Sequence, residues 1–64
     1  MIDIETGSGV IRVQKSSFKG HDFIDVRKFY FDEESGELRP TKKGISISPD
    51  LVPQVLEAIK KLTL

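Results

Sequence analysis

The sequence contains no cysteine and a single histidine, His21. Disulfide bonds and thiolate zinc sites are therefore excluded, and one histidine cannot build a structural metal site alone. No stretch approaches the roughly 18 apolar residues of a membrane span, and the opening MIDIETGSG carries neither a basic region nor an apolar run. We therefore expect an intracellular protein that has no membrane partner and that uses neither a metal nor a cofactor.

Groups for enzyme catalysis are also scarce. His21 and Asp22 are neighbours in sequence, and adjacent strand residues point to opposite faces, so they do not form a base with its orienting carboxylate. No base that could activate the serines of KSSF can be assigned. The acidic stretch DEESGE lacks the twelve-residue spacing of a calcium loop. The sequence predicts that the protein is not an enzyme and that its acidic turn stays solvated.

What is present is a short chain with balanced charge. Sixty-four residues form one domain, 1–64, and such a chain buries only about 60% of its unfolded surface, so self-association is the expected source of added stability. Ten basic residues balance ten acidic ones. Between Arg12 and Lys28, however, five basic residues meet only Asp22 and Asp25, so the neutral total can hide a basic face.

Hydrophobic alternation predicts three strands, in VIRVQ, over residues 21–32 and in GISIS, joined by a turn around Gly20 and a loop at DEESGEL. One amphipathic helix follows, with Ser48 as its N-cap and Pro49 in its first position. Its apolar stripe exceeds what so small a sheet can cover, which favours packing on the sheet together with a partner's helix. The expected dimer-interface residues are Val52, Val55, Leu56, Ile59 and Leu62.

The second strand contains a change of phase. Ile24 and Val26 lie two apart, but the next apolar pair, Phe29 and Phe31, falls on odd numbers. A β-bulge at Arg27 and Lys28 would keep all four apolar side chains in the core. The solvent-facing side would then carry Asp25, Arg27 and Tyr30.

Basic and aromatic residues alternate along this region, a combination typical of proteins that hold single-stranded nucleic acid by its phosphates and by base stacking. Gly44 lies on the face opposite Ile45 and Ile47, where a missing side chain permits close approach to the backbone. The alternative is that the aromatic residues belong to the edge of the core and the cations only confer solubility. The residues concerned are Phe18, Lys19, Arg27, Tyr30, Lys42 and Lys43.

The segment FKGHDFIDVRKFYFDEESGELRPTKKGISIS, followed by a helix that starts with proline, resembles the single-stranded-DNA-binding C-terminal domain of the transcriptional coactivator positive cofactor four. The shared pattern is F-K-G, then D-[IV]-R with an aromatic pair, an acidic G-E turn, [KR]-P and [KR]-K-G-I-S. The resemblance implies an α+β fold, with a four-stranded, strongly curved antiparallel β-sheet and one C-terminal α-helix. It further implies a homodimer formed through the helices, with paired channels for single strands.

The resemblance also implies a set of DNA-contacting residues. Tyr30 stands where the family often has tryptophan, and His21 stands where it tends to have lysine, so the contribution of His21 would be weaker and pH-dependent. Lys19, Arg27, Lys42 and Lys43 would contact phosphates, and Phe18 and Tyr30 would stack on bases. The implied nucleic-acid-binding set is Phe18, Lys19, His21, Arg27, Tyr30, Lys42, Lys43 and Gly44.

We therefore expect a homodimer that binds single-stranded DNA or melted duplex with little sequence preference. A minimal bacterial or phage relative would act in the cytoplasm in replication, recombination or repair, and a eukaryotic one would act in transcription in the nucleus, with unidentified protein partners. Two alternatives stay open. RNA would satisfy the same stacking and phosphate contacts, and the apolar helix face could instead dock a different protein.

Overall fold

The computed structural model of the protein describes residues 1–63. Four strands are followed by a short 3₁₀ helix and one α-helix: β1 (Ile2–Glu5), β2 (Gly9–Phe18), β3 (His21–Asp32), β4 (Glu37–Ile47), η1 (Pro49–Leu51) and α1 (Val52–Thr63). The strands form one antiparallel sheet in the order β1-β2-β3-β4. The expected architecture, a four-stranded antiparallel sheet followed by a C-terminal helix, is confirmed.

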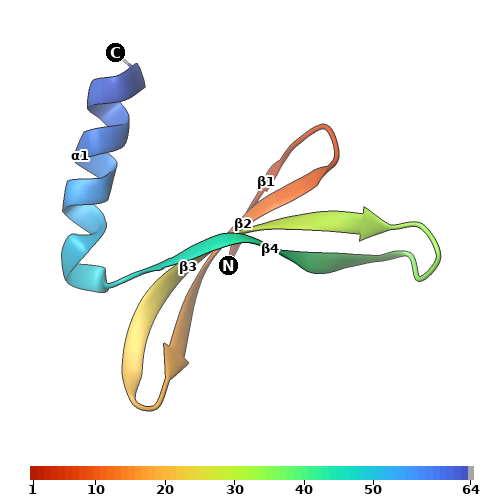
Figure 1. Ribbon diagram of the computed structural model, residues 1–64, viewed down its shortest axis with the longest axis horizontal. Coiled ribbons are helices and arrows are strands. Elements are labelled where there is room, and N and C mark those ends of the chain that lie inside the picture. The colour runs from red at the N-terminus through yellow and green to blue at the C-terminus, as the bar shows by residue number, and fades with distance from the viewer. Residues whose placement is uncertain (64) are drawn as a thin grey trace.

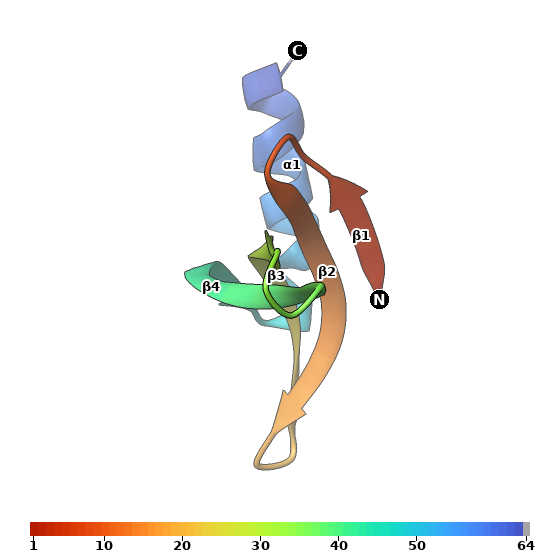
Figure 2. The same cartoon turned by 90° about the vertical axis from the view of Figure 1, so that its right-hand side faces the viewer.

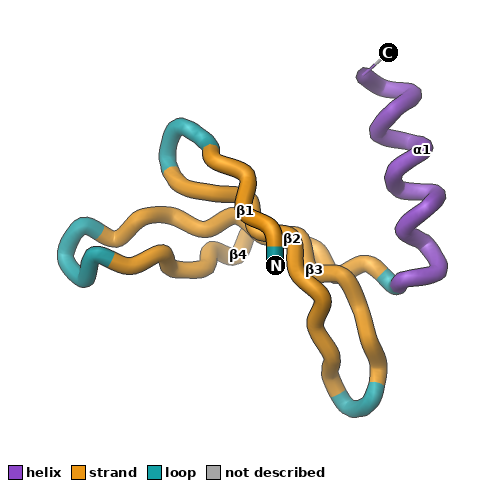
Figure 3. The backbone as a smooth tube through the Cα atoms, turned by 180° about the vertical axis from the view of Figure 1, so that it is seen from behind, coloured by secondary structure: helices purple, strands orange, loops and turns teal. Residues whose placement is uncertain are grey.

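The sheet is so twisted that its three hairpin loops point in three different directions (Figures 1 and 3). Helix α1 stands beside the sheet and is joined to it through the end of β4 (Figures 1 and 2). The chain measures 39 × 36 × 18 Å, and its radius of gyration is 13.5 Å. A compact domain of this length would have a radius of gyration of about 11 Å, so the fold is unusually open.

The hairpin between β2 and β3 turns within two residues. Lys19 (φ 52°) and Gly20 (φ 79°) both adopt the left-handed conformation, as a type I′ turn requires, and the flanking Phe18 and His21 are paired. The turn predicted around Gly20 is therefore present. It presents Lys19 at the tip of a long, otherwise regular hairpin.

The irregularity near Arg27 differs from the β-bulge that the sequence predicts. A register shift does occur between Arg27 and Phe29, but in the pairing with β4, where three residues lie opposite Lys28. The pairing of β3 with β2 is regular throughout. Side chains of β3 therefore keep alternating, and the prediction that Ile24, Val26, Phe29 and Phe31 share one face was wrong.

The regular register also corrects the outer face of β3. Asp25 and Arg27 share a face with Phe29 and Phe31, whereas Tyr30 lies on the other side. Asp25 is buried (7% exposed), against the prediction that it faces solvent, and Phe31 is 55% exposed, against the prediction that it is core. Phe29 is buried as expected.

Each face of the sheet carries apolar side chains, in different places. On one face Val10 and Phe29 are paired and buried, and the guanidinium of Arg12 lies 4.4 Å from the centre of the Phe29 ring. On the opposite face, a row of isoleucine and valine side chains lines a groove together with side chains of α1. The helix has no buried residue, so this second apolar face is only partly covered.

The helical segment begins at the predicted residues, with Ser48 in the N-cap position and Pro49 first, but its first turn is a 3₁₀ helix. Pro49 starts a 3₁₀ turn, and the α-helix begins at Val52. Ser48 makes no side-chain capping bond to the helix backbone; its hydroxyl instead donates to the Asp50 carboxylate. This hydrogen bond holds the pKa of Asp50 below its ordinary value. Neither helical segment of the described chain is long and apolar enough to cross a membrane.

Candidate nucleic-acid interface

Arg27 occupies the centre of the candidate site. A row of paired residues, Asp3, Arg12, Arg27 and Gly44, crosses the four strands. Arg12 is committed to Asp3 through two hydrogen bonds of 2.8 and 3.0 Å and lowers the pKa of that carboxyl group. Arg27 ends the row of side chains, because its neighbour Gly44 has none.

The side chain of Arg27 crosses the space above Gly44. A Cβ atom on Gly44 would lie 2.9 Å from both Cγ and Cζ of Arg27. The guanidinium donates from Nη1 to the Thr41 carbonyl oxygen (3.0 Å), and from Nε and Nη2 to the two carboxylate oxygens of Asp25 (3.5 and 3.4 Å). A guanidinium has five N–H donors, so one donor on each terminal nitrogen remains, and 29% of the side chain is exposed.

Thr41 organises the extra residues of β4. Its hydroxyl donates to the Lys28 carbonyl oxygen at 2.7 Å and accepts the backbone N–H of Lys43 at 3.1 Å. The register shift is thus held on one side by a threonine hydroxyl and on the other by Arg27. Lys42 and Lys43 are exposed within this segment, beside the backbone to which Arg27 is bonded.

The lysines carry the uncommitted positive charge. Within residues 1–63 three ion pairs occur, and each joins an arginine to an aspartate: Arg12 to Asp3, Arg27 to Asp25 and Arg39 to Asp32. Lys42 and Lys43 are therefore available to an external anion.

A second group of predicted site residues lies at the tip of the β2–β3 hairpin. Phe18 is 66% exposed, and the Lys19 ammonium lies 5.4 Å from the centre of its ring. His21 is also exposed. Arg27 lies six residue steps along β3 from His21, roughly 20 Å at about 3.3 Å per residue. The tip and the Arg27 region can therefore contact only different nucleotides of one strand.

Two exposed aromatic residues lie near the other end of β3, on opposite faces. Tyr30 (44% exposed) is paired with Gly9 and Arg39, and Phe31 (55% exposed) is paired with Leu38. The prediction that Tyr30 and Arg27 share one face is therefore wrong, because the two side chains lie on opposite faces of β3. Of these two aromatic residues, the one on the Arg27 side is Phe31, and its exposure contradicts the prediction that it is core.

Four of the five expected interface residues of the helix line an apolar groove. The groove has a volume of about 400 Å³. Its walls are the apolar face of the sheet and four of the five predicted residues: Val52, Val55, Leu56 and Ile59. Leu62 is 87% exposed and is not among the lining residues.

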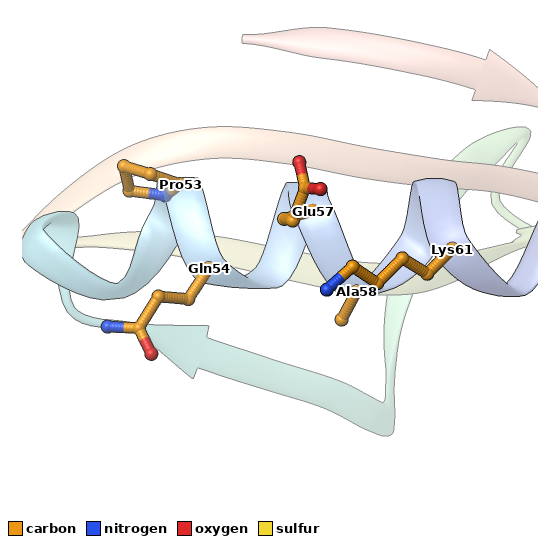
Figure 4. A pocket seen from close by; sticks show the side chains of 5 residues that line it. All are labelled: Pro53, Gln54, Glu57, Ala58 and Lys61. Carbon is orange, nitrogen blue, oxygen red and sulfur yellow. The ribbon is translucent and has the colours of Figure 1, made fainter.

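The opposite face of α1 carries a mixture of polar, charged and small side chains. Figure 4 shows Pro53, Gln54, Glu57, Ala58 and Lys61, which form a shallow surface on this face. Because one helix supplies all five side chains, there is no second wall to enclose a ligand. We assign this face no binding role.

The family described as Transcriptional Coactivator p15 (PC4) matches residues 5–58. The chain belongs to this family. The match includes all the strands that carry the candidate site and most of α1, and it confirms the resemblance noted in the sequence.

Similarity to individual proteins agrees with this membership. The chain is 41% identical over 46 residues to the RNA polymerase II transcriptional coactivator SUB1 of Saccharomyces cerevisiae, covering 72% of this chain and 16% of that protein. It is 34% identical over 58 residues to the RNA polymerase II transcriptional coactivator of Drosophila melanogaster, covering 91% and 51% respectively. The chain thus spans about half or less of these curated relatives.

A bacterial structure shares the whole fold. The crystal structure of a PC4 homologue from Burkholderia pseudomallei superposes with a TM-score of 0.88 and 29% identity, covering 100% of this chain and 94% of that one. A bacterial member of the PC4 family therefore has the same strand arrangement and helix, at nearly the same length.

Proposed function

We propose that two copies of the chain form a non-enzymatic module that binds single-stranded DNA or melted duplex with little sequence preference. Lys19, Arg27, Lys42 and Lys43 contact phosphates, and Phe18 and Tyr30 stack on bases. Gly44 and His21 complete the site, in a positioning and an auxiliary role respectively. The family's coactivator relatives support a role in a DNA-templated process, with transcription as the first candidate.

The observation that carries this proposal is the Arg27 region. An arginine with two unused donors lies next to two exposed lysines on a segment that bulges from the sheet. Phosphates are bound by such groups without regard to base identity. Exposed aromatic side chains at both ends of β3 supply stacking surfaces, which tolerate any base.

The second copy is supported by the surface that the isolated chain leaves open. The 7.2 kDa chain exposes 5366 Å², whereas a compact monomer of this mass exposes about 4,100 Å². The excess, roughly 1,200 Å², is the area that one subunit of a homodimer typically buries. A second copy fits because it offers the same apolar helix stripe for the groove and the same groove for the first copy's helix.

Titration of a labelled oligonucleotide tests the function. We expect binding to single-stranded DNA and much weaker binding to duplex of the same sequence. If about three phosphates are neutralised, the logarithm of affinity falls with the logarithm of salt at a slope near −2, from about −0.7 per phosphate. A matched RNA strand decides between the two nucleic acids. Equal binding of duplex, or none of either single strand, would contradict the proposal.

Charge reversal locates the phosphate contacts. The double variant K42E/K43E is expected to abolish binding while the dimer persists, because both lysines lie outside the apolar groove. The variant K60E/K61E is the matched control, since it makes the same change of charge in the last turn of α1. Equal loss in the two variants would show that overall charge, rather than this site, controls binding.

A further inference from the structure

The Arg27 side chain is hydrogen-bonded to two neighbours and passes close over a third. Asp25 is buried and accepts two of its N–H groups, the Thr41 carbonyl accepts a third, and Gly44 leaves the space through which its side chain runs. We infer that Asp25, Thr41 and Gly44 are positioning residues, which control nucleic-acid binding through Arg27. This inference rests on the proposed function and explains which residues prepare its central phosphate contact.

The contacts of Asp25 favour a positioning role over a purely electrostatic one. Its carboxylate meets the guanidinium side-on, through Nε and Nη2, and leaves one N–H on each terminal nitrogen unused. A long arginine side chain loses considerable rotamer freedom when it binds a phosphate. Here that freedom is restricted before the ligand arrives, so less is lost on binding.

Gly44 also acts as a positioning residue, because it has no side chain to block the path of Arg27. A methyl group at this position would lie 2.9 Å from two atoms of Arg27 and 2.9 Å from the Val26 carbonyl oxygen. The Arg27 side chain would have to leave its path and give up the bond to Thr41. The close approach that the sequence predicted above Gly44 is thus made by Arg27, and Gly44 acts on the ligand through that side chain.

The Asp25→Asn substitution separates a positioning role from a purely electrostatic one, because the two predict opposite changes in binding affinity. The change removes a negative charge beside the phosphate site, so charge alone predicts tighter binding. Positioning predicts weaker binding, because an asparagine amide keeps one acceptor oxygen and places an NH₂ donor where Arg27 needs the second. We expect the affinity for a single-stranded oligonucleotide to fall about tenfold, as for loss of one charge-assisted hydrogen bond, and the salt slope to become shallower by about 0.7.

Asp32→Asn is the matched control. Asp32 also pairs with an arginine, Arg39, at 2.6 Å, but at the far end of the β3–β4 hairpin. The Asp32→Asn substitution makes the same change of charge as Asp25→Asn. We expect it to leave the affinity within about twofold, since one screened surface charge contributes little binding free energy. Tighter binding by Asp25→Asn, or equal weakening by both variants, would overturn the inference.

A double-mutant cycle tests whether these residues act through Arg27. We expect Gly44→Ala and Asp25→Asn each to weaken binding in the wild-type background, but to have no further effect when Arg27 is already alanine. Thermal unfolding of every variant identifies loss of folding; if Gly44→Ala does not fold, the Asp25 cycle decides alone. If the effects of these substitutions and of Arg27→Ala are additive, the inference is overturned but the proposed function stands. A wild-type chain that binds no oligonucleotide would overturn both.

Discussion

Truncation of two helix residues tests the role of the apolar groove in self-association. In the isolated chain Leu56 is 54% and Ile59 is 52% exposed, although both line the groove. Complete burial of such a side chain contributes about 1.5 to 3 kcal/mol. Because half of each side chain remains to be buried, a second copy that covered the groove would add about 1 kcal/mol per residue.

The double variant L56A/I59A removes this contribution from four side chains of a dimer. The loss amounts to about 4 kcal/mol, or roughly a thousandfold in the dimer dissociation constant. Sedimentation equilibrium over a range of protein concentrations measures this constant directly. Glu57→Ala is the matched control, because Glu57 lies on the face of the same helix that points away from the groove, and we expect this change to leave the constant unchanged.

Two results would refute this reasoning. A dissociation constant that L56A/I59A leaves unchanged would show that the groove is not the interface. A wild-type chain that stays monomeric at every concentration would remove self-association altogether and favour the alternative in which the helix face docks another protein.

Three further predictions concern single features of the sheet. Tyr30→Ala should weaken oligonucleotide binding by about 1 to 3 kcal/mol if a base stacks there; unchanged affinity in a folded variant would remove Tyr30 from the site, and Phe31→Ala in the same titration tests the aromatic on the Arg27 side. Gly9→Ala should lower the free energy of unfolding by about 1 to 3 kcal/mol, because its Cβ would lie 2.0 Å from the Phe29 carbonyl oxygen, whereas Gly7→Ala meets no atom within 4 Å and should be tolerated. Hydrogen bonds from Arg12 and Arg39 hold the pKa values of Asp3 and Asp32 below their ordinary value. The stability that these two carboxylates contribute is therefore present above about pH 4 and is lost as the pH falls through their folded-state pKa values. Thermal unfolding from pH 7 to pH 2 should show this loss, and an unchanged profile in the D3N/D32N variant would contradict the prediction.

Much of the fold could be predicted from local patterns. Ile11 with Val13 and Ile45 with Ile47 do share the apolar face that looks toward α1, because alternation reports directly on a half-buried strand. Strand β1 was not predicted from the residues, although Ile2 and Ile4 flank Asp3 with the same period. Two apolar residues give too short a pattern, and the pairing of Asp3 with Arg12 becomes visible only once the strands are aligned.

The candidate site was only partly predictable. The sequence predicts Arg27, Lys42 and Lys43 as candidate site residues, because positive charge is a property of the residues themselves. The contribution of Asp25 and Thr41 depends on which atoms face Arg27 across β3 and β4. The sequence offers one signal for Asp25, its position two residues before Arg27, which places both on one strand face.

The change of phase in β3 has a cause that neither composition nor local spacing reveals. Apolar side chains switch from Ile24 and Val26 to Phe29 and Phe31 while the pairing with β2 stays regular. The switch occurs where burial passes from one face of the sheet to the other. Ile24 and Val26 line the groove beside α1, whereas Phe29 and Phe31 lie on the face where Val10 and Phe29 are buried. In a strand of 12 residues within a sheet twisted this strongly, the two ends can be covered on opposite sides. A parity change in such a strand therefore marks a change of covered face, and the extra residues that accompany it belong to β4, where they present Lys42 and Lys43 next to Arg27.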